Sequence, residues 1–181
     1  MNSPTKSIKT EVISTRLLIK WLRLTAEVML ENKYYLSDLD SPIGDADHGI
    51  NMDRGFSKVL SRLEKLESED HSTIMKDTGM ALVSSVGGVA GPLYGSFFIQ
   101  AGNSLAGKTN VNTEDLYECL LQGLAGVKSR GLATIGEKTM VDAMEPAIAA
   151  MKHSLQKGKS TTEALGHAVL AAESGMLATT A

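Results

Sequence analysis

Apolar residues recur at helical spacing through nearly every segment of this chain, while the alternating pattern of β-strands is almost absent. In the stretch RLLIKWLRLTAEVMLENK the apolar positions follow the i, i+3, i+4, i+7 spacing of an amphipathic helix. The predicted stripe consists of Leu18, Trp21, Leu22, Thr25 and Val28. This periodicity constrains the fold more than any other feature, because helical stripes must be buried against other helices.

Further helices are predicted near 52–65, 73–86, 92–106, 113–130, 142–157 and 161–179. Gly158 suits a helix end, and Ser160 with Glu163 has capping-box spacing. Pro146 requires that its helix either begins near Asp142 or is kinked. We find no internal repeat, low-complexity tract or linker. The sequence therefore predicts one all-α domain over residues 1–181, built as a helical bundle.

Composition excludes several classes of partner. A net charge of −3 gives no general attraction to nucleic acid or to an anionic membrane. The opening MNSPTKSIKTEVIS has no signal-type apolar segment, and no later run approaches the length of a membrane span. Cys119, the single cysteine, cannot form an internal disulfide, which suits a reducing compartment. We expect a cytoplasmic protein with neither nucleic acid nor membrane as partner.

Residues 102–109, GNSLAGKT, match the phosphate-loop pattern G-x-x-x-x-G-K-[ST]. A phosphate loop joins a buried strand to a helix that begins at its lysine and threonine. Here Gly102 falls inside a predicted helix, and the next helix begins only near Asn112. We interpret the match as a helix end at Gly107 followed by a polar connection.

Residues 34–55, YYLSDLDSPIGDADHGINMDRG, place five aspartates around a turn rich in proline and glycine. They are Asp38, Asp40, Asp45, Asp47 and Asp53. Carboxylates held together repel by roughly 4 kcal/mol per close pair, and a hard divalent cation reverses that sign, with Mg²⁺ or Ca²⁺ favoured by oxygen ligands. An EF-hand is excluded because glycine occupies the fifth loop position. The open alternative is a solvated loop whose aspartates cap turns. His48 could likewise contact a phosphate or a metal, or only hydrogen-bond a carboxylate.

Two other loops open helices. In SSVGGVAGPLYGS, residues 84–96, Gly87, Gly88 and Gly91 would let backbone N–H groups approach an anion at a helix N-terminus. The open alternative is close helix packing through small residues, which the stretch on its own favours over an anion site. In SRGLATIGEKTMVDAM, residues 129–144, a glycine-bearing loop precedes another helix.

Alternate connections of an antiparallel bundle lie at the same end. The loops 38–51, 87–92 and 131–140 could therefore converge on one rim. That rim would offer carboxylates for metal, amides for phosphate, and Met140 with other apolar atoms for a base, which together form a magnesium-nucleotide site.

The strings SPIGDADHGINMDRGF, TGMALVSSVGGVAGPLYGSFF, SRG and GEKTMVDA resemble, in order and spacing, the L-subunit family of dihydroxyacetone kinases, called DhaL. The resemblance runs from Trp21 to the end of the chain. It implies an all-α barrel of amphipathic, mostly antiparallel helices that holds a nucleotide at one rim. By the same resemblance, the magnesium ligands are Asp40, Asp45 and Asp47. The implied nucleotide contacts are His48, Gly49, Ile50, Asn51, Gly88, Val89, Ala90, Gly131 and Met140.

The chain departs from the family at two places. Ala90 stands where many relatives have serine, so backbone amides must replace a hydroxyl contact. The family also continues past GMLATTA with a glycine- and arginine-containing segment that folds over the nucleotide. None of that segment is present, so we expect the chain to be incomplete at its C-terminus.

The family implies that ADP or ATP is a bound coenzyme and that a partner K subunit holds dihydroxyacetone. A phosphohistidine protein of the phosphotransferase system, which draws on phosphoenolpyruvate, would recharge ADP in place. ADP carries roughly −3 and the three aspartates another −3, so two Mg²⁺ ions neutralise the site better than one. No nucleophile paired with a base is evident, and no catalytic side chain is assigned.

Three other functions remain open. A nucleotide-loaded module that docks on a transcription regulator would use the same site. The nucleotide domain of a fatty-acid kinase has similar aspartates but is usually attached to further domains. A carboxylate-metal hydrolase would turn over ATP alone.

Overall fold

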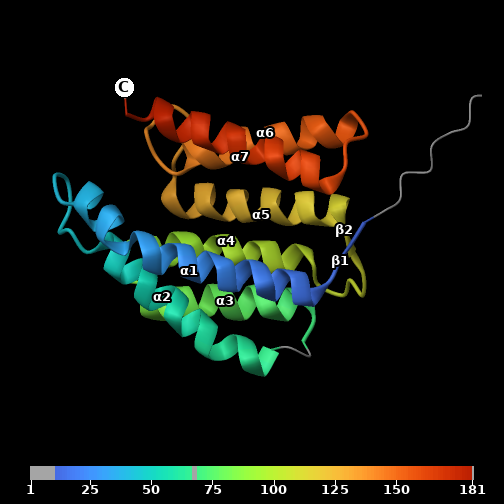
Figure 1. The fold of residues 1–181 in the computed structure, drawn as a ribbon, viewed down its shortest axis with the longest axis horizontal. Coiled ribbons are helices and arrows are strands. Elements are labelled where there is room, and N and C mark those ends of the chain that lie inside the picture. Colours follow the sequence, from blue (N-terminus) through green and yellow to red (C-terminus); the bar gives the residue numbers. More distant parts are fainter. Residues whose placement is uncertain (1–10, 67–68, 181) are drawn as a thin grey trace, which may run out of the picture.

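A computed structural model describes residues 11–66 and 69–180, and within them the chain forms seven α-helices (Figure 1). The opening residues, where the sequence predicts no signal segment, lie largely outside the described part. The helices are α1 (Thr15–Asp40), α2 (His48–Leu63), α3 (His71–Ser85), α4 (Ala90–Ser104), α5 (Thr113–Gly131), α6 (Val141–Gln156) and α7 (Thr161–Ala178). A short 3-10 helix, η1 (Glu64–Leu66), follows α2.

Side-chain caps fix where several helices begin. The Ser14 hydroxyl accepts from the backbone of the first turn of α1. Asn112 with Asp115 forms a capping box at the start of α5, and Ser160 with Glu163 forms the predicted one at the start of α7. Each cap satisfies backbone N–H groups that have no partner inside the helix.

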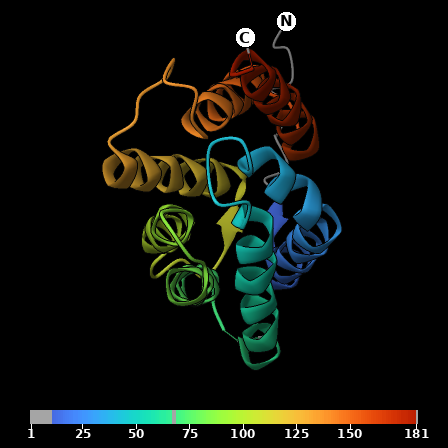
Figure 2. The same ribbon diagram turned by 90° about the vertical axis from the view of Figure 1, so that its left-hand side faces the viewer.

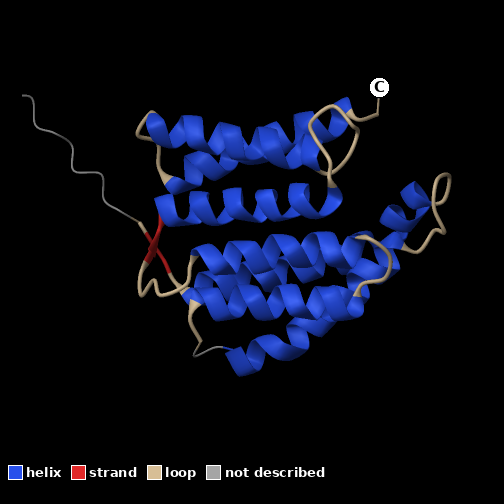
Figure 3. Ribbon diagram, turned by 180° about the vertical axis from the view of Figure 1, so that it is seen from behind, coloured by secondary structure: helices blue, strands red, loops and turns tan. Residues whose placement is uncertain are grey.

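Consecutive helices pack against each other in chain order and run mostly antiparallel (Figure 3). The core between them is apolar, and its fully buried side chains include Leu22 of α1, Leu63 of α2, Ile74 of α3 and Val127 of α5. The predicted all-α fold of mostly antiparallel helices is confirmed.

Glycines allow the closest helix contacts. A Cβ on Gly79 of α3 would lie 2.7 Å from the backbone oxygen of Gly95 on α4. A Cβ on Gly126 of α5 would lie 2.8 Å from the backbone oxygen of Ser96 on α4. These helices therefore meet backbone to backbone, which a larger side chain would prevent.

The predicted stripe on the first helix is only partly buried. Leu22 is buried and Leu18 packs against the core, whereas Trp21 and Val28 are 41% and 50% exposed. The buried side also includes Ile19 and Ala26, which lie outside the predicted stripe. Helix α1 carries apolar residues over much of its circumference, so periodicity alone did not identify the buried face.

The structure also differs from the sequence-based prediction in smaller elements. Strands β1 (Val12–Ile13) and β2 (Val111–Asn112) pair antiparallel, with Val12 opposite Asn112, and were not predicted. Helix α4 begins at Ala90, two residues before the predicted start at 92. Helix α6 begins at Val141, which agrees with the predicted start near Asp142, and contains Pro146. No helix in the described ranges combines the length and apolar content that crossing a bilayer requires.

Three inter-helix loops lie at one end of the bundle, and the β1–β2 ribbon lies at the other (Figure 1). They are residues 41–47 after α1, residues 86–89 after α3 and residues 132–140 after α5. Figure 2 shows this end facing the viewer, with loop 41–47 above the start of α2. We call this end the rim.

Candidate magnesium-nucleotide site

Three carboxylates meet at the rim. Asp40 is the last residue of α1, Asp45 lies in the following loop, and Asp47 immediately precedes α2. One carboxylate oxygen from each lies within 4.8 Å of the others. Asp38 and Asp53 are not in this group, and Asp53 instead pairs with Lys33 of α1 at 3.2 Å.

The loop backbone forces this arrangement. Ala46 has φ +60°, a left-handed conformation that reverses the chain between Asp45 and Asp47. A Cβ on Gly44 would lie 2.2 Å from Oδ1 of Asp40, so a larger residue here would displace that carboxylate. The backbone N–H of Asp47 donates to Oδ2 of Asp40 at 3.2 Å, which ties the two ends of the loop together.

This donor set fits magnesium. Three carboxylates that share one point repel by roughly 4 kcal/mol per pair at an effective dielectric of 20, and one backbone N–H bond does not offset that. Asp45 is exposed and the other two are half-buried, so the cluster faces solvent. Mg²⁺ is bound in proteins through few carboxylates and keeps positions for water and phosphate oxygens.

The residues that follow the cluster occupy the first turn of α2. His48 is half-buried and Ile50 is 49% exposed. Gly49 is buried against α1, where a Cβ would lie 1.9 Å from the backbone oxygen of Lys33. Asn51 is 6% exposed, and its Oδ1 accepts from Arg54 at 2.5 Å. Gly49, one of the four residues of this turn that are predicted to contact the nucleotide, therefore also has a packing role.

The second loop separates the two explanations that the sequence left open. Gly88 has φ +61° and nothing within 4 Å of its Cβ position, so it shapes the turn and leaves open space. Gly91 is buried, and a Cβ there would lie 2.5 Å from the backbone oxygen of Val86, which is a packing constraint. Val89 is 77% exposed and Ala90 is buried at the first position of α4. The exposed part of this turn, Gly88 and Val89, therefore lies directly before the positive end of α4.

The third loop carries the two residues expected beside the nucleoside. Gly131 ends α5 and is exposed, and a Cβ there would lie 3.1 Å from Leu93 of α4. Met140 immediately precedes α6 and is half-buried against the core. The two residues therefore stand at opposite ends of the 132–140 loop.

Contacts between helices bring the three loops together. Nε of Arg54 on α2 donates to the backbone oxygen of Ser85 at the end of α3, at 2.9 Å. A Cβ on Gly87 would lie 3.1 Å from Nδ2 of Asn51, so the glycine turn packs on the first turn of α2. With the Gly131–Leu93 contact, these interactions connect all three predicted segments along one rim.

Two further groups among residues 11–66 and 69–180 do not form a competing site. Cys119 is buried, and burial raises the pKa of its thiol to about 12, so it is not a nucleophile at neutral pH. Lys108 of the phosphate-loop match forms an ion pair with Asp115 at the opposite end of the bundle. That stretch ends α4 and leads to β2, so the interpretation as a helix end and polar connection is confirmed.

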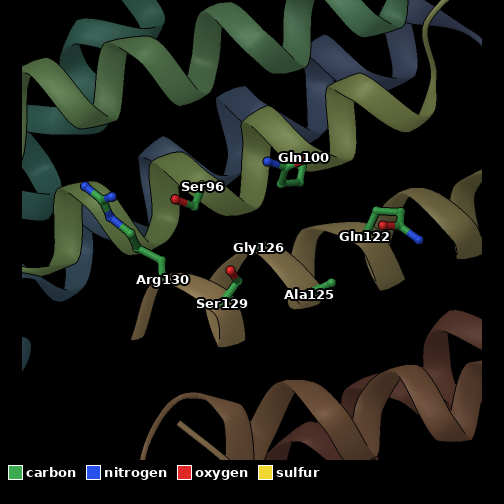
Figure 4. Close-up of a pocket in the computed structure, with 7 residues that line it drawn as sticks. All are labelled: Ser96, Gln100, Gln122, Ala125, Gly126, Ser129 and Arg130. Carbon is green, nitrogen blue, oxygen red and sulfur yellow. The ribbon is translucent and has the colours of Figure 1, made fainter. Parts of the chain in front are cut away.

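A polar cleft of about 390 Å³ lies between α4 and α5 (Figure 4). Ser96 and Gln100 line it from α4, and Gln122, Ser129 and Arg130 line it from α5. It contains none of the predicted site residues, and it is open to solvent. We assign it no role in nucleotide binding.

Two residues near the rim were not singled out from the sequence. Ser37 lies one helical turn before Asp40, and its buried hydroxyl has no hydrogen-bond partner. Asp142 accepts hydrogen bonds from two backbone N–H groups of the 132–140 loop. The spacing of Thr139 and Asp142 in TMVD is that of a capping box, which is the signal that could have identified Asp142.

Residues 42–181 match the DAK2 domain family. The chain is 41% identical over 167 residues to the "PEP-dependent dihydroxyacetone kinase, ADP-binding subunit DhaL" of Escherichia coli, covering 92% of this chain and 80% of that protein. It is 43% identical over 161 residues to the "PTS-dependent dihydroxyacetone kinase, ADP-binding subunit DhaL" of Lactococcus lactis, covering 89% and 79%.

Solved structures of the dihydroxyacetone kinase of C. freundii have the same fold. The native form superposes with a TM-score of 0.73 at 26% identity, covering 97% of this chain and 30% of that one. The complex with AMP-PNP and Mg²⁺ superposes with a TM-score of 0.68 at 23% identity, covering 99% and 36%. The chain thus spans about a third of the solved kinase chains.

Proposed function

The chain belongs to the DAK2 domain family, and from that membership we propose that it is the ADP/ATP-binding phosphotransferase subunit of a dihydroxyacetone kinase. The observation that carries the proposal is the cluster of Asp40, Asp45 and Asp47 at the rim, with the exposed turn at Gly88 and Val89 at the same end. We treat residues 1–181 as one DhaL-like nucleotide-binding domain of the cytoplasm, which stays a prediction.

In this proposal the three aspartates hold Mg²⁺, and two ions fit the charge better than one. A nucleoside diphosphate brings roughly −3 to a cluster of −3, so one ion leaves about −4 and two leave about −2. Bound magnesium would neutralise phosphate charge and orient the phosphoryl group for in-line transfer. The protein itself supplies fixed oxygens, with the turn at Gly44 and Ala46 holding them in place.

The phosphates would lie between two helix starts. His48, Gly49, Ile50 and Asn51 form the first turn of α2. The first N–H groups of a helix have no acceptor within it, whereas the N–H of Asn51 already donates to the backbone oxygen of Asp47 at 2.9 Å. Gly88, Val89 and Ala90 form the start of α4. Because residue 90 has no hydroxyl, its contribution is limited to the backbone N–H.

The nucleoside would lie toward the third loop. Gly131 offers an exposed backbone surface with no side chain, and Met140 offers a thioether that adapts its shape to a base. No side chain is assigned a covalent role, because positioning and charge neutralisation suffice for phosphoryl transfer.

The partners follow from the family. A K subunit would present dihydroxyacetone to the rim, and a phosphohistidine protein of the phosphotransferase system would recharge ADP while it stays bound. A nucleotide held as a coenzyme must stay bound through each turnover. Such a site needs several protein groups that hold the metal and the phosphates, and a single contact would not suffice. Docking on a transcription regulator would use the same loaded rim and is compatible with this activity.

The test replaces Asp45 with alanine. Asp45→Ala removes one of three metal ligands, so Mg²⁺-dependent retention of ADP should be lost. The wild-type protein should be stabilised by about 2.7 kcal/mol at a ligand concentration 100 times Kd, which corresponds to a Tm increase of roughly 5–10 °C. The variant should show little of this increase.

Asp38→Ala is the matched control, because Asp38 is an exposed aspartate of α1 outside the cluster. It should retain ADP and the full Tm increase. Equal retention by the Asp45→Ala and wild-type proteins, with normal transfer to dihydroxyacetone in the presence of a K subunit, would refute the assignment.

A further inference from the structure

The loop that joins α5 to α6 has a strained backbone. Leu132 has φ +53° and Lys138 has φ +56°, both in the left-handed region that side chains disfavour, and Gly136 has φ +93°. A non-glycine residue in this region is less stable than in its ordinary conformation. Interactions elsewhere must therefore hold the loop in this shape.

Asp142, in the first turn of α6, supplies two such interactions. Its Oδ1 accepts from the backbone N–H of Gly136 at 2.6 Å, and its Oδ2 accepts from the backbone N–H of Thr139 at 2.9 Å. One carboxylate thus spans the second half of the loop with both oxygens. These N–H groups hold the pKa of Asp142 below its usual value, so the charged form is the one that binds the loop.

Helices α6 and α7 hold Asp142 itself. Pro146 has no N–H to donate to the backbone oxygen of Asp142, so the usual helical bond across this turn is missing. Gly175 of α7 packs closely against this oxygen, since a Cβ there would lie 2.0 Å from it. The first turn of α6 is therefore held by its packing on α7 and by the two hydrogen bonds that Asp142 accepts from the 132–140 loop.

We propose that Asp142 is a positioning residue for the nucleoside half of the site: its carboxylate fixes the 136–140 loop so that Met140 and the end of α5 at Gly131 keep the separation that a base requires. This inference rests on the proposed function and deepens it. Asp142 does not touch the nucleotide, and its effect is confined to the part of the ligand that lies beside the third loop.

The experiment compares ADP with inorganic pyrophosphate, which has the same diphosphate and no nucleoside. Asp142→Asn keeps one acceptor oxygen, while its amide NH₂ cannot accept from the second N–H group. The expected result is an ADP affinity about tenfold weaker in the presence of Mg²⁺, the equivalent of ~1.4 kcal/mol. The affinity for pyrophosphate, measured by competition against ADP in each protein, should stay within about twofold.

Asp115→Asn is the matched control. Like Asp142, Asp115 accepts a hydrogen bond from the backbone N–H three residues before it, but it does so in the capping box of α5 at the opposite end of the bundle. It should weaken neither ligand. Amide hydrogen exchange at Gly136 and Thr139 should be faster in Asp142→Asn alone.

Three results would overturn the inference. Wild-type ADP affinity in Asp142→Asn would show that the carboxylate does not position the nucleoside, while the proposed function would stand. Equal weakening of ADP and pyrophosphate would show a general structural effect instead. Failure of the wild-type protein to bind ADP with Mg²⁺ would remove the proposed function and this inference together.

Discussion

At the scale of single residues, Ser37 is a buried hydroxyl without a hydrogen-bond partner. A buried polar group left unsatisfied is unfavourable by about 1–3 kcal/mol, and alanine is also the better helix former. Ser37→Ala should therefore raise the free energy of unfolding of the metal-free protein by about 1 kcal/mol. Urea denaturation followed by circular dichroism measures this change.

Ser154 provides the comparison, because it is a buried serine in a helix whose hydroxyl is satisfied. It bonds to the backbone oxygen of Ala150 at 2.9 Å and to Nδ1 of His167 at 2.8 Å. Ser154→Ala gains the same helix propensity but loses both bonds, so it should be less stable than Ser37→Ala by at least about 1 kcal/mol. The reverse order would show that the Ser37 hydroxyl has a hydrogen-bond partner in solution, such as a water molecule.

The sequence could predict that carboxylates gather between the first two helices, because five aspartates surround a turn. Which three meet depends on backbone geometry that left no clear signal. Ala46 adopts a left-handed conformation usually marked by glycine, and Gly44 matters for the space it leaves beside Asp40. The nucleotide contacts assigned by resemblance remain predictions, although the structure brings their three segments to one rim.

At the scale of elements, helix positions were predictable because caps and glycines mark their ends. Elements of two residues were not, since β1 and β2 are too short to show alternation. The buried face of α1 was misjudged for a different reason. Leu17, Leu24 and Val28 are apolar and yet about half exposed, so the hydrophobic pattern did not distinguish the core side.

The cap of α7 leads to a pH prediction. Lys159 and then the backbone and hydroxyl of Ser160 bind the carboxylate of Glu163 and hold its pKa at about 2, below the ordinary 4.5. A depressed pKa means that this contribution to stability is fully present above the unfolded value of 4.5. It is lost as the pH falls from 4.5 toward 2.

Glu163→Gln removes the titrating group. As the pH falls from roughly 5 to roughly 2, the free energy of unfolding should decrease more steeply for the wild-type protein than for this variant. Urea midpoints across the range measure the difference. Glu173→Gln, an exposed position on the same helix, should follow the wild-type slope, and identical slopes for all three proteins would contradict the role of Glu163.

At the scale of the whole molecule, the position of the rim depends on how closely the helices pack. Helix α3 leads into the glycine turn and α4 leads out of it, and the two meet at Gly79 and Gly95. The sequence left the small residues of this stretch open as either a packing surface or an anion site; the structure shows packing at two of them, and anion binding stays a prediction. Gly91 and Gly95 pack, while Gly88 leaves space for a ligand.

Gly79→Ala tests this packing. The added Cβ would lie 2.7 Å from the backbone oxygen of Gly95 and 3.0 Å from the backbone nitrogen of Ile99, and neither atom can rotate away. Overpacking of this kind is unfavourable by about 1–3 kcal/mol, which outweighs the gain of up to about 1 kcal/mol in helix propensity. The free energy of unfolding should therefore fall.

Gly166→Ala is the matched control, because this glycine of α7 has nothing within 4 Å of its Cβ position. Only the propensity gain remains there, so the same substitution should raise the free energy of unfolding by about 0.5–1 kcal/mol. Urea denaturation of both variants gives the two signs directly. Stabilisation by Gly79→Ala would mean that α3 and α4 are farther apart in solution than this contact requires, and the glycine turn would then not be fixed by helix packing.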